Sequence, residues 1–390
     1  MRTPMRILFV ADGRSPITQQ WLAYFIEQGY QVHLASTFVC EAQPGLASLH
    51  HTPVAYSGAG GGRKAARGLL PTGLRTALRN LAGPLTLPGA AAGLQAVIRQ
   101  VQPQLVHALR IPYEGMLAAT AMQNSPLPLL LSVWGNDFTL HARSTPLMAA
   151  ATRRALRRAS GLLADTQRDL RLAQDLALPA GAPTLAVPGN GGVRRDLFHP
   201  PKQPFATPRI INPRGIRAYV RNDVFFKALS IVVKDVPELQ VDCPAMANEP
   251  QAEAWVRQYG LQTHVNLLHK LTPADLAERY RHAQLMVSPS THDGTPNTLL
   301  EAMACGLLPV AGDLDSIREW ITPSENGLLV NPNDADALAS AILHGLSDAT
   351  LRSKAASLNS TLIAERADYH TGMRRAESFY QAILDRDSDV

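Results

Sequence analysis

The 390-residue sequence is poor in cysteine, in aromatic residues and in long apolar runs. Its three cysteines, Cys40, Cys243 and Cys305, lie far apart and form no C-x-x-C pair, which argues against a disulfide framework and against a cysteine-based zinc site. No stretch approaches the roughly 20 consecutive apolar residues that a membrane-spanning helix needs. The first apolar run, Ile7–Ala11, is too short for the core of a signal peptide. We therefore expect a soluble protein of the cytoplasm, where thiols stay reduced.

Acidic residues are also missing from a long stretch of the first half, since none occurs between Glu41 and Glu114. Residues 1–205 contain 20 lysines and arginines against 9 aspartates and glutamates, whereas residues 206–390 contain 17 against 23. The net charge of +5 thus divides into +11 and −6. This asymmetry favours contact of the first half with an anionic partner.

The length suits two domains of roughly 150 residues or more, and 46% apolar residues can fill two cores. Short runs rich in Leu, Val and Ile alternate with segments of helical period, and this pattern restarts after the proline-rich stretch 199–204. Such alternation predicts parallel sheets covered by helices on both faces. We predict an α/β protein with two doubly wound, Rossmann-like domains, 1–200 and 205–372, that face a ligand cleft. We expect residues 373–390 to form a helix that braces the first domain.

The segment 55–100 interrupts this alternation and is rich in Gly, Ala, Pro and Arg. From Pro71 onward, four apolar residues fall on one helical face with two arginines beside it, which is typical of a basic amphipathic helix on an anionic membrane surface. These residues are Leu74, Ala77, Leu78 and Leu81 on the face and Arg75 and Arg79 beside it. A surface insertion that packs on its own domain explains the same pattern equally well.

The most informative stretch is 288–306, which reads SPSTHDGTPNTLLEAMACG. A predicted strand ends at Ser288, and a helix begins near Pro296, a residue type suited to a first helical turn. Amide groups at a helix start bind phosphate, and the acids Asp293 and Glu301 at the edges suit the hydroxyl groups of a nucleotide sugar. The residues expected to surround the diphosphate are Gly294, Thr295, Pro296, Asn297, Thr298 and Leu299.

Asp293 and Glu301, separated by seven residues and followed by Ala-Met-Ala-Cys-Gly and Leu-Pro-Val, resemble the Glu-x7-Glu signature of retaining glycosyltransferases of the GT-B fold. This is the family 4-like type, the glycosyl transferases group 1. The resemblance continues through 317–319 and 326–330. It implies that Glu301 holds the ribose hydroxyls and that Asp293 contacts the donor sugar. Asp293 stands where Glu is usual, so its reach is one methylene shorter.

Three arginines between the first strand and helix of the second half complete this resemblance. Arg214, within Asn-Pro-Arg-Gly, matches a basic residue that in the family touches the diphosphate and stabilises the leaving group. Arg221 matches the family's second basic position only with one inserted residue and with Arg for Lys, and Arg217 is a substitute for either. The alternative is a surface ion-pair cluster. Fixed cations there take the place of a metal ion, so the resemblance implies a metal-independent enzyme with no cofactor beyond its nucleotide-sugar donor.

The first half resembles the same family more weakly. Asp12 and Gly13 follow the first strand, in a loop that in the family lies over donor and acceptor. His107 ends the strand Leu105–Ala108 and matches a strand whose final His lines the cleft. Asp137 closes a loop similar to the family's His-Gly-x-Asp, but Trp134 occupies the place of its His. Either His107 or no histidine then lies near the reacting sugar.

Two other patterns contain residue types that bind metals, but their surroundings do not favour a metal site. Asp313-Leu-Asp315 is a D-x-D pattern, yet it follows a late strand where the family has a plain loop. The doublet His50-His51 has no carboxylate nearby, which favours a surface loop. We predict no metal site.

Taken together, the resemblance implies a retaining, metal-independent glycosyltransferase that moves a sugar from a nucleotide-diphosphate sugar, with UDP as the commonest base, to an acceptor hydroxyl on a glycan or lipid-linked sugar. Two alternatives are an epimerase or hydrolase on the same scaffold and a non-catalytic nucleic-acid-binding protein. The second lacks any recognisable nucleic-acid module, so nucleic acid is not expected as a partner. The basic half predicts peripheral contact with an anionic membrane, at the inner face of the plasma membrane.

Overall fold

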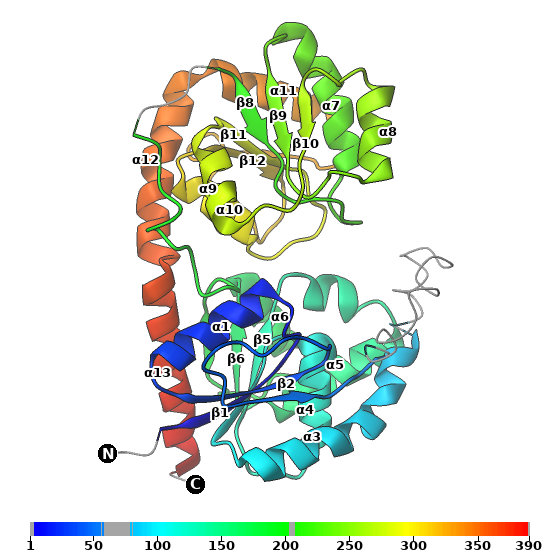
Figure 1. Ribbon diagram of the computed structural model, residues 1–390, viewed down its shortest axis with the longest axis vertical. Helices are drawn as coiled ribbons and strands as arrows, with labels where there is room; N and C mark the ends of the chain where they lie inside the picture. The colour runs from blue at the N-terminus through cyan, green and yellow to red at the C-terminus, as the bar shows by residue number, and fades with distance from the viewer. Residues whose placement is uncertain (1–3, 56, 58–78, 80, 203–206, 389–390) are drawn as a thin grey trace. The chain divides into compact units, whose positions relative to one another are not determined.

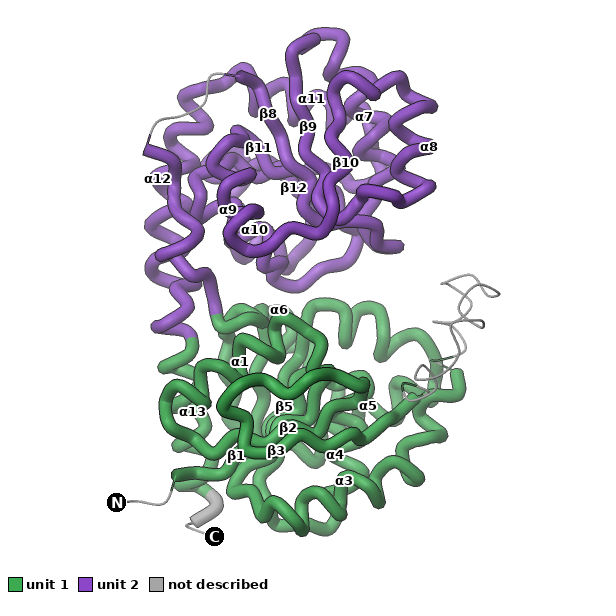
Figure 2. The backbone as a smooth tube through the Cα atoms, in the orientation of Figure 1, with its two compact units in different colours: residues 1–191, 373–390 green, residues 192–372 purple. Residues whose placement is uncertain are grey.

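The computed structural model describes residues 4–388 apart from 56, 58–78, 80 and 203–206. The chain forms two compact units, residues 1–191 with 373–390 and residues 192–372 (Figure 2). Most of the amphipathic helix expected from Pro71 lies outside the described residues. Within them, no helix is long and apolar enough to cross a membrane.

Unit 1 contains a seven-stranded parallel sheet in the order β3-β2-β1-β4-β5-β6-β7. Its strands are β1 (Arg6–Ala11), β2 (Gln31–Ser36), β3 (Ser48–His51), β4 (Leu105–Ala108), β5 (Leu129–Val133), β6 (Gly161–Ala164) and β7 (Thr184–Ala186). The apolar runs of the central strands are buried, as a sheet covered on both faces requires. The His50-His51 doublet, expected in a loop, instead ends the edge strand β3, which pairs in parallel with β2.

Helices cover both faces of this sheet (Figure 1). Leu8 and Val10 of β1 share one core with α3, α4 and α5, whereas Phe9 faces the opposite side and packs on Phe25 of α1. The helical segments are α1 (Pro16–Glu27), η3 (Gly83–Thr86), α3 (Leu87–Val101), η4 (Ile111–Gly115), α4 (Met116–Ala121), η5 (Asp137–His141), α5 (Pro146–Arg158) and α6 (Gln167–Leu176).

The end of α13 (Tyr369–Ser388) belongs to unit 1 and completes its core. The hydroxyls of Tyr24 and Tyr30 donate hydrogen bonds to Glu377 at 2.9 and 2.7 Å. The ring of Tyr380 is fully buried and stacks on Phe25 with centroids 4.7 Å apart. The last helix therefore supplies both polar and apolar contacts to α1 and to the turn that follows it.

Unit 2 repeats the same architecture with six parallel strands in the order β10-β9-β8-β11-β12-β13. The strands are β8 (Arg209–Ile211), β9 (Gln240–Cys243), β10 (Val265–Leu267), β11 (Leu285–Ser288), β12 (Leu308–Gly312) and β13 (Leu328–Val330). The helices are α7 (Asn222–Asp235), α8 (Pro250–Gln258), α9 (Pro273–Arg281), α10 (Asn297–Ala304), α11 (Ala335–Ser347) and α12 (Ala349–Arg366). The predicted class, two Rossmann-like α/β domains, is confirmed.

The boundary between the units lies at 191–192, whereas the sequence suggested 200–205. The Val193 amide donates to the carbonyl of Ala367 at 2.6 Å, and the Tyr369 amide donates to the carbonyl of Val193 at 3.1 Å. Phe198 packs in the core of unit 2. The proline-rich stretch therefore follows a segment that is already part of the second unit.

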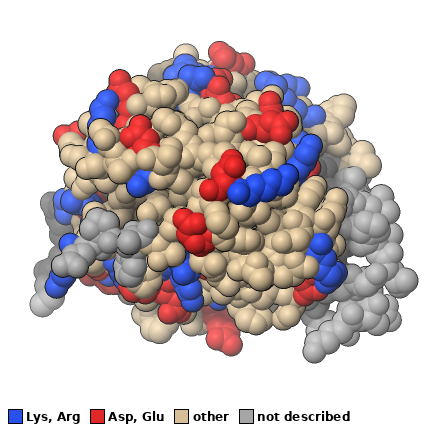
Figure 3. All heavy atoms as spheres, turned by 90° about the horizontal axis from the view of Figure 1, so that it is seen from above, with Lys and Arg blue, Asp and Glu red and all other residues tan. Residues whose placement is uncertain are grey.

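In each sheet the strand order reverses beside the first strand, between β1 and β4 in unit 1 and between β8 and β11 in unit 2. Loops leaving the carboxyl ends of two such strands diverge and leave space for a ligand. Charge does not single out another region on the face drawn in Figure 3, where the described Lys and Arg side chains are interspersed with Asp and Glu. The two reversal points are therefore the first places to look for binding sites.

Candidate functional site

The start of α10 forms the centre of the site in unit 2. The residue before the helix, Pro296, has an extended backbone, and the helix begins at Asn297. The preceding loop is fixed by two side chains: Ser316 donates to the carbonyl of Asp293 at 2.7 Å, and the indole of Trp320 donates to the hydroxyl of Thr295 at 2.9 Å. Because the first amides of a helix lack intrahelical acceptors, this rigid loop presents hydrogen-bond donors at the positive end of the helix dipole.

Arg214 and Asp293 form a largely buried ion pair at this helix start. Their Nη2 and Oδ2 atoms are 2.6 Å apart, and the two side chains are 9% and 11% exposed. A second nitrogen of Arg214 lies 3.4 Å from the hydroxyl of Thr298. Burial raises the pKa of Asp293, and the charge of Arg214 opposes that rise. Three predicted residues from two separate segments are thus brought into one group.

The loop that carries Arg214 is fixed by two buried asparagines. Asn212 donates to the side-chain oxygen of Asn222 at 3.0 Å, and Asn222 donates to the carbonyl of Gly215 at 3.0 Å. Gly215 has a positive φ of 64°, which suits glycine. The guanidinium is therefore held toward the start of α10 by its own loop.

Glu301 lies on the second turn of α10 and is partly buried. Burial raises the pKa of its carboxyl group to about 7, and the nearby charge of Arg214 lowers it by less. None of the described residues donates a hydrogen bond to this carboxylate. Glu301 therefore retains acceptor capacity for hydroxyl groups of a ligand.

The side chains of Arg221 and Arg217 contact other residues than Asp293, Thr298 and Glu301. Arg221 binds both carboxylate oxygens of Asp223, at 2.9 and 2.6 Å, and also contacts Asn333. Arg217 is exposed and donates to the carbonyl of Arg214 and to the hydroxyl of Tyr219. The prediction that Arg221 serves as a second diphosphate ligand is not supported by this geometry, because its guanidinium is used in a surface ion pair.

Gly312, the last residue of β12, allows the loop after β11 to approach this strand. A Cβ atom on Gly312 would lie 2.2 Å from the carbonyl oxygen of Ser290. The variant Gly312→Ala is expected to destabilise unit 2 by about 2 kcal/mol or more, since the backbone of the loop must move. Thermal unfolding measures this effect, and a melting temperature equal to that of the wild type would contradict the close approach. The exposed glycine variant Gly260→Asn is a suitable control, because Gly260 meets no neighbouring atom and Asn tolerates its positive φ.

His107 has a packing role, which corrects the expectation that it acts in catalysis. Its ring has no exposed surface, Nδ1 is hydrogen-bonded to the hydroxyl of Tyr380, and Nε2 lies 2.8 Å from the hydroxyl of Ser132. Phe9 and Trp21 pack against the ring. Burial lowers the pKa of His107 to about 3. A neutral, enclosed imidazole of this kind cannot reach a substrate.

The variant His107→Leu is expected to lose about 2–4 kcal/mol of stability, because two buried hydroxyl groups lose their partner. The pH dependence gives a second signature. Since the unfolded chain takes up a proton near pH 6.5 and folded His107 does not, the wild type loses stability as the pH falls below that value, and the variant loses less. Urea unfolding at about pH 7 and about pH 5 measures both effects. Equal stability at the higher pH would rule out the packing role.

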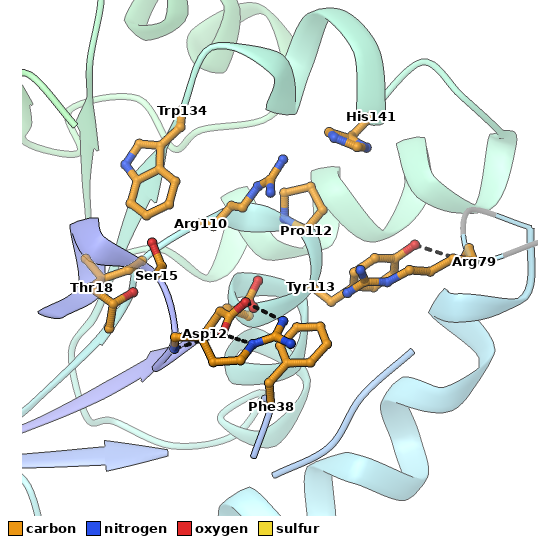
Figure 4. A pocket seen from close by; sticks show the side chains of 13 residues that line it. Asp12, Ser15, Thr18, Phe38, Arg79, Arg110, Pro112, Tyr113, Trp134 and His141 are labelled. Carbon is orange, nitrogen blue, oxygen red and sulfur yellow. Dashed lines mark hydrogen bonds and ion pairs between the residues drawn. The ribbon is translucent and has the colours of Figure 1, made fainter. Parts of the chain in front are cut away.

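Unit 1 contains a cavity of about 380 Å³ at its own strand-order reversal, shown in Figure 4. We call it the arginine pocket. Three arginines and three aromatic residues line it: Arg14, Arg79, Arg110, Phe38, Tyr113 and Trp134. The sequence predicted the neighbouring Asp12 and Gly13 but missed all three arginines as a group, because they come from distant loops.

The predicted residues of unit 1 shape this pocket in different ways. Asp12 lines it and pairs with Arg14 at 2.9 Å. The amide of Gly13 donates to the hydroxyl of Ser36 at 3.1 Å. Asp137 is buried and accepts hydrogen bonds from Arg110 and from the amides of Ile111 and Trp134, so it fixes the loops around the pocket.

Within the described part of the chain, no group of three or more His, Cys, Asp or Glu side chains is placed to hold a metal ion. In the D-x-D pattern, the carboxylate of Asp313 accepts two hydrogen bonds from Arg318, of 2.6 and 2.7 Å.

Two models of known protein families match this chain, one within each unit. Residues 12–189 match the family model of the glycosyl transferase 4-like domain, and residues 215–348 match that of the glycosyl transferases group 1. The chain carries both domains of a GT-B glycosyltransferase. The group at the start of α10 therefore lies within the second of these glycosyltransferase domains, and the arginine pocket lies within the first.

Solved glycosyltransferase structures share the fold over nearly the whole chain. Sucrose-phosphate synthase from Thermosynechococcus elongatus superposes with a TM-score of 0.76 at 17% identity, covering 99% of this chain and 100% of that one. Anabaena HepE in complex with UDP gives a TM-score of 0.73 at 16% identity, covering 97% and 100%. Because the sequence identities are this low, these structures show the fold of the chain and nothing further about it.

Curated relatives match over shorter segments. The O-antigen chain mannosyltransferase B of Escherichia coli is 33% identical over 100 residues, which cover 26% of this chain and 23% of that protein. The phosphatidyl-myo-inositol mannosyltransferase of Mycolicibacterium smegmatis is 32% identical over 133 residues, or 33% of each protein. The chain thus spans about a quarter and a third of the length of these two glycosyltransferase relatives.

Proposed function

We propose that this protein is a retaining, metal-independent glycosyltransferase that transfers a sugar from a nucleotide-diphosphate sugar to an acceptor hydroxyl. One observation carries the proposal: the start of α10 brings Arg214, Asp293 and Thr298 together, and Glu301 follows one turn later. A fixed cation and a helix start suit a diphosphate, and two carboxyl groups suit the hydroxyls of the sugars at its two ends.

Each group has a distinct task in this proposal. Arg214 and the amides of residues 294–299 bind the diphosphate and stabilise the charge that develops on it when the glycosidic bond breaks. Glu301 accepts hydrogen bonds from the ribose hydroxyls, and Asp293 accepts from a hydroxyl of the donor sugar. No metal ion is needed if these fixed charges neutralise the leaving group.

Retention of the anomeric configuration follows if the acceptor attacks from the face that the diphosphate leaves. An oxygen of the departing phosphate then takes the proton of the acceptor hydroxyl, so that no side chain has to act as a general base. The enclosure of His107 is compatible with this route, and so is Trp134, which stands where the family has a histidine and lines the arginine pocket.

For the donor we propose a UDP-sugar, because solved neighbours of the same fold include complexes with UDP and UDP-glucose. A GDP-linked mannose is the second candidate. A relative from Xanthomonas campestris, 30% identical over 95 residues, bears the name GDP-mannose:cellobiosyl-diphosphopolyprenol alpha-mannosyltransferase.

We propose a lipid-linked or cell-surface glycan precursor as acceptor and a peripheral location at the inner face of the plasma membrane. The charge of +11 in residues 1–205 supports this location, as do the exposed side chains of Val39, Leu81 and Leu85. Sedimentation with anionic liposomes tests it. Neutralising Arg63, Lys64, Arg67 and Arg75 should abolish co-sedimentation, and unchanged sedimentation would rule out this basic segment as the contact.

A panel of nucleotide sugars tests the activity. The protein is incubated with each donor, with and without bacterial lipid extract, and released nucleotide is measured. Release that requires an acceptor supports transfer, whereas acceptor-independent release indicates the hydrolase alternative and isomerised donor indicates the epimerase. Absence of any release or isomerisation would contradict the enzyme proposal. The anomeric configuration of the product, read by NMR, tests retention.

A further inference from the structure

The arginine pocket of unit 1 carries more positive charge than an uncharged acceptor needs. From its geometry we propose that it binds a phosphate group of the acceptor, so that the substrate is a phosphate ester of a hydroxylated compound. This inference rests on the proposed function, because it identifies the acceptor class of the same enzyme.

Aromatic rings hold two of the guanidinium groups in place. Arg14 lies over the ring of Phe38, with its central carbon 3.7 Å from the ring centroid. Arg79 lies 4.6 Å from the centroid of Tyr113, and the Tyr113 hydroxyl donates to the backbone carbonyl of Arg79 at 2.8 Å. Stacking of this kind leaves in-plane N–H groups available to an oxyanion, except Nε and Nη2 of Arg14, which bind the carboxylate of Asp12.

The charges in the pocket do not balance among the described residues. Arg14 pairs with Asp12 and Arg110 pairs with Asp137, each at 2.9 Å. Arg79 has no ion pair in that part of the chain. The pocket therefore has one cation in excess of these two ion pairs.

Neither of the remaining titratable groups of the pocket, Glu114 and His141, forms an ion pair with Arg79. Burial raises the pKa of Glu114, whose carboxyl group accepts from Thr37 at 2.8 Å, and so favours its uncharged form. Burial and the charge of Arg110 lower the pKa of His141 to about 4, so that His141 is neutral at pH 7. An anionic ligand would supply the ion-pair partner that Arg79 lacks among the described residues.

Two buried polar atoms of residues that line the pocket have no hydrogen-bond partner among the described residues. They are Nε of Arg79 and the hydroxyl oxygen of Thr18, a residue that is 1% exposed. Leaving such groups unpaired is costly, and a ligand that fills the cavity removes the cost. Figure 4 shows Thr18 and Ser15 on one side of the pocket and Arg79 on the other, with Arg110 between them.

This arrangement fits a ligand with a charged end and a hydroxylated body. A phosphate ester offers several strong acceptor oxygens in a tetrahedral arrangement, which the arginines approach from different directions. The hydroxyl groups of the ligand would lie at Ser15 and Thr18. The phosphate could belong to a soluble ester or to a lipid headgroup, and the two sources require separate tests.

The experiment measures binding of glycerol 3-phosphate to the full-length protein by titration calorimetry, with glycerol as the uncharged comparison. A second arm measures co-sedimentation with phosphatidylcholine vesicles that contain or lack phosphatidic acid. Three variants are compared with the wild type in both arms: Arg79→Gln, Arg14→Gln and the control Arg157→Gln. Arg157 is an exposed arginine of α5 that does not line the pocket.

We expect Arg79→Gln to weaken glycerol 3-phosphate binding by about tenfold or more, as expected for the loss of a charge-assisted hydrogen bond. Arg14→Gln, at a side chain that is 48% exposed and so tolerant of replacement, should weaken it as well, and Arg157→Gln should not. If glycerol 3-phosphate does not bind, but Arg79→Gln and Arg14→Gln weaken co-sedimentation with vesicles that contain phosphatidic acid, the inference is supported and the phosphate belongs to a lipid headgroup.

Two results would overturn the inference: no binding of either probe by the wild type, or binding that Arg79→Gln and Arg14→Gln leave unchanged. These results are independent of the donor panel. Nucleotide release without phosphate binding would contradict only the acceptor class, whereas phosphate binding without release from any donor would contradict only the proposed transferase activity.

Discussion

Replacing Glu301 by Gln is expected to lower kcat/KM for the nucleotide-sugar donor by about 10²-fold, because two hydroxyl groups lose their carboxylate acceptor. An amide of the same shape offers one weaker acceptor and one donor in its place. Since Glu301 has no hydrogen-bond donor among the described residues of the free protein, the loss concerns contacts made only with the ligand. Steady-state kinetics at sub-saturating donor measures it.

The same variant is expected to be more stable than the wild type at alkaline pH. The pKa of Glu301 is raised from 4.5 to about 7 by burial. Between these values the folded protein binds a proton that the unfolded chain does not, so the wild type loses stability as the pH rises through this window. Glu301→Gln removes that loss, which amounts to about 3 kcal/mol when complete. Thermal unfolding at about pH 8 should therefore show a higher melting temperature for the variant.

Glu325→Gln is the matched control, because Glu325 is an exposed acid of the same unit. It should leave kinetics and melting temperature unchanged. A Glu301→Gln variant with the turnover of the wild type would contradict the assignment of the ribose contact. A variant that is less stable than the wild type at alkaline pH would contradict the burial of an ionisable carboxyl group.

Replacing Arg214 by Ala is expected to lower kcat by about 10²–10³-fold, the effect typical of removing one group that stabilises developing negative charge. It should also cost about 3 kcal/mol of stability, because Asp293 is only 11% exposed and would lose its cation at 2.6 Å. With the cation removed, the pKa of Asp293 should rise further. The variant should therefore regain stability as the pH falls and this carboxyl group takes up a proton.

Arg214→Lys separates the two effects, because lysine retains the charge and loses the planar guanidinium donors. It should restore more stability than activity. Arg257→Ala, at an exposed arginine of α8 that pairs with Glu253 at 3.7 Å, is the control and should change neither quantity. Donor turnover in Arg214→Ala equal to that of the wild type would show that the diphosphate does not bind at this arginine.

Apart from the edge strand β3, both sheets could be predicted from the sequence, and so could the grouping of residues at the start of α10, because their signals are local. The strand ending at Ser288, the Gly- and Pro-containing turn and the helix with Glu301 occupy one continuous segment, and the structure keeps that order as β11, loop and α10. Arg214 follows a neighbouring strand, and parallel strands bring their carboxyl ends to one edge. The local sequence pattern and the order of parallel strands were therefore sufficient to predict that Arg214 lies near the start of α10.

The role of His107 could not be predicted in the same way, since the hydroxyl that binds its Nδ1 belongs to Tyr380, 273 residues later in the chain. A strand ending in His looks the same in sequence whether its ring is exposed or enclosed. Arg221 is different, because its partner Asp223 is only two residues away. The surface ion pair, given above as the alternative for these arginines, is the arrangement that the structure shows for Arg221.

The arginine pocket could not be predicted from the sequence because its lining residues come from separate segments of the chain. Arg14, Phe38, Arg79 and Tyr113 come from four loops or helix ends, and no spacing along the chain links them. The place of Asp12 after the first strand is visible in the sequence, whereas nothing local marks its partner Arg14, two residues later, as part of a pocket. Stacking of arginine on aromatic rings from other segments becomes visible only when the sheet brings those segments to one edge.

Hydrogen exchange of the full-length protein with and without nucleotide sugar tests the central claim most directly, because it reports where the donor binds without requiring an acceptor. UDP-glucose and GDP-mannose are the two donors to compare. Binding at the start of α10 predicts slower exchange in peptides covering residues 212–223 and 289–305, and loss of this protection in Glu301→Gln. Protection confined to other segments, or equal protection in the variant, would contradict the account.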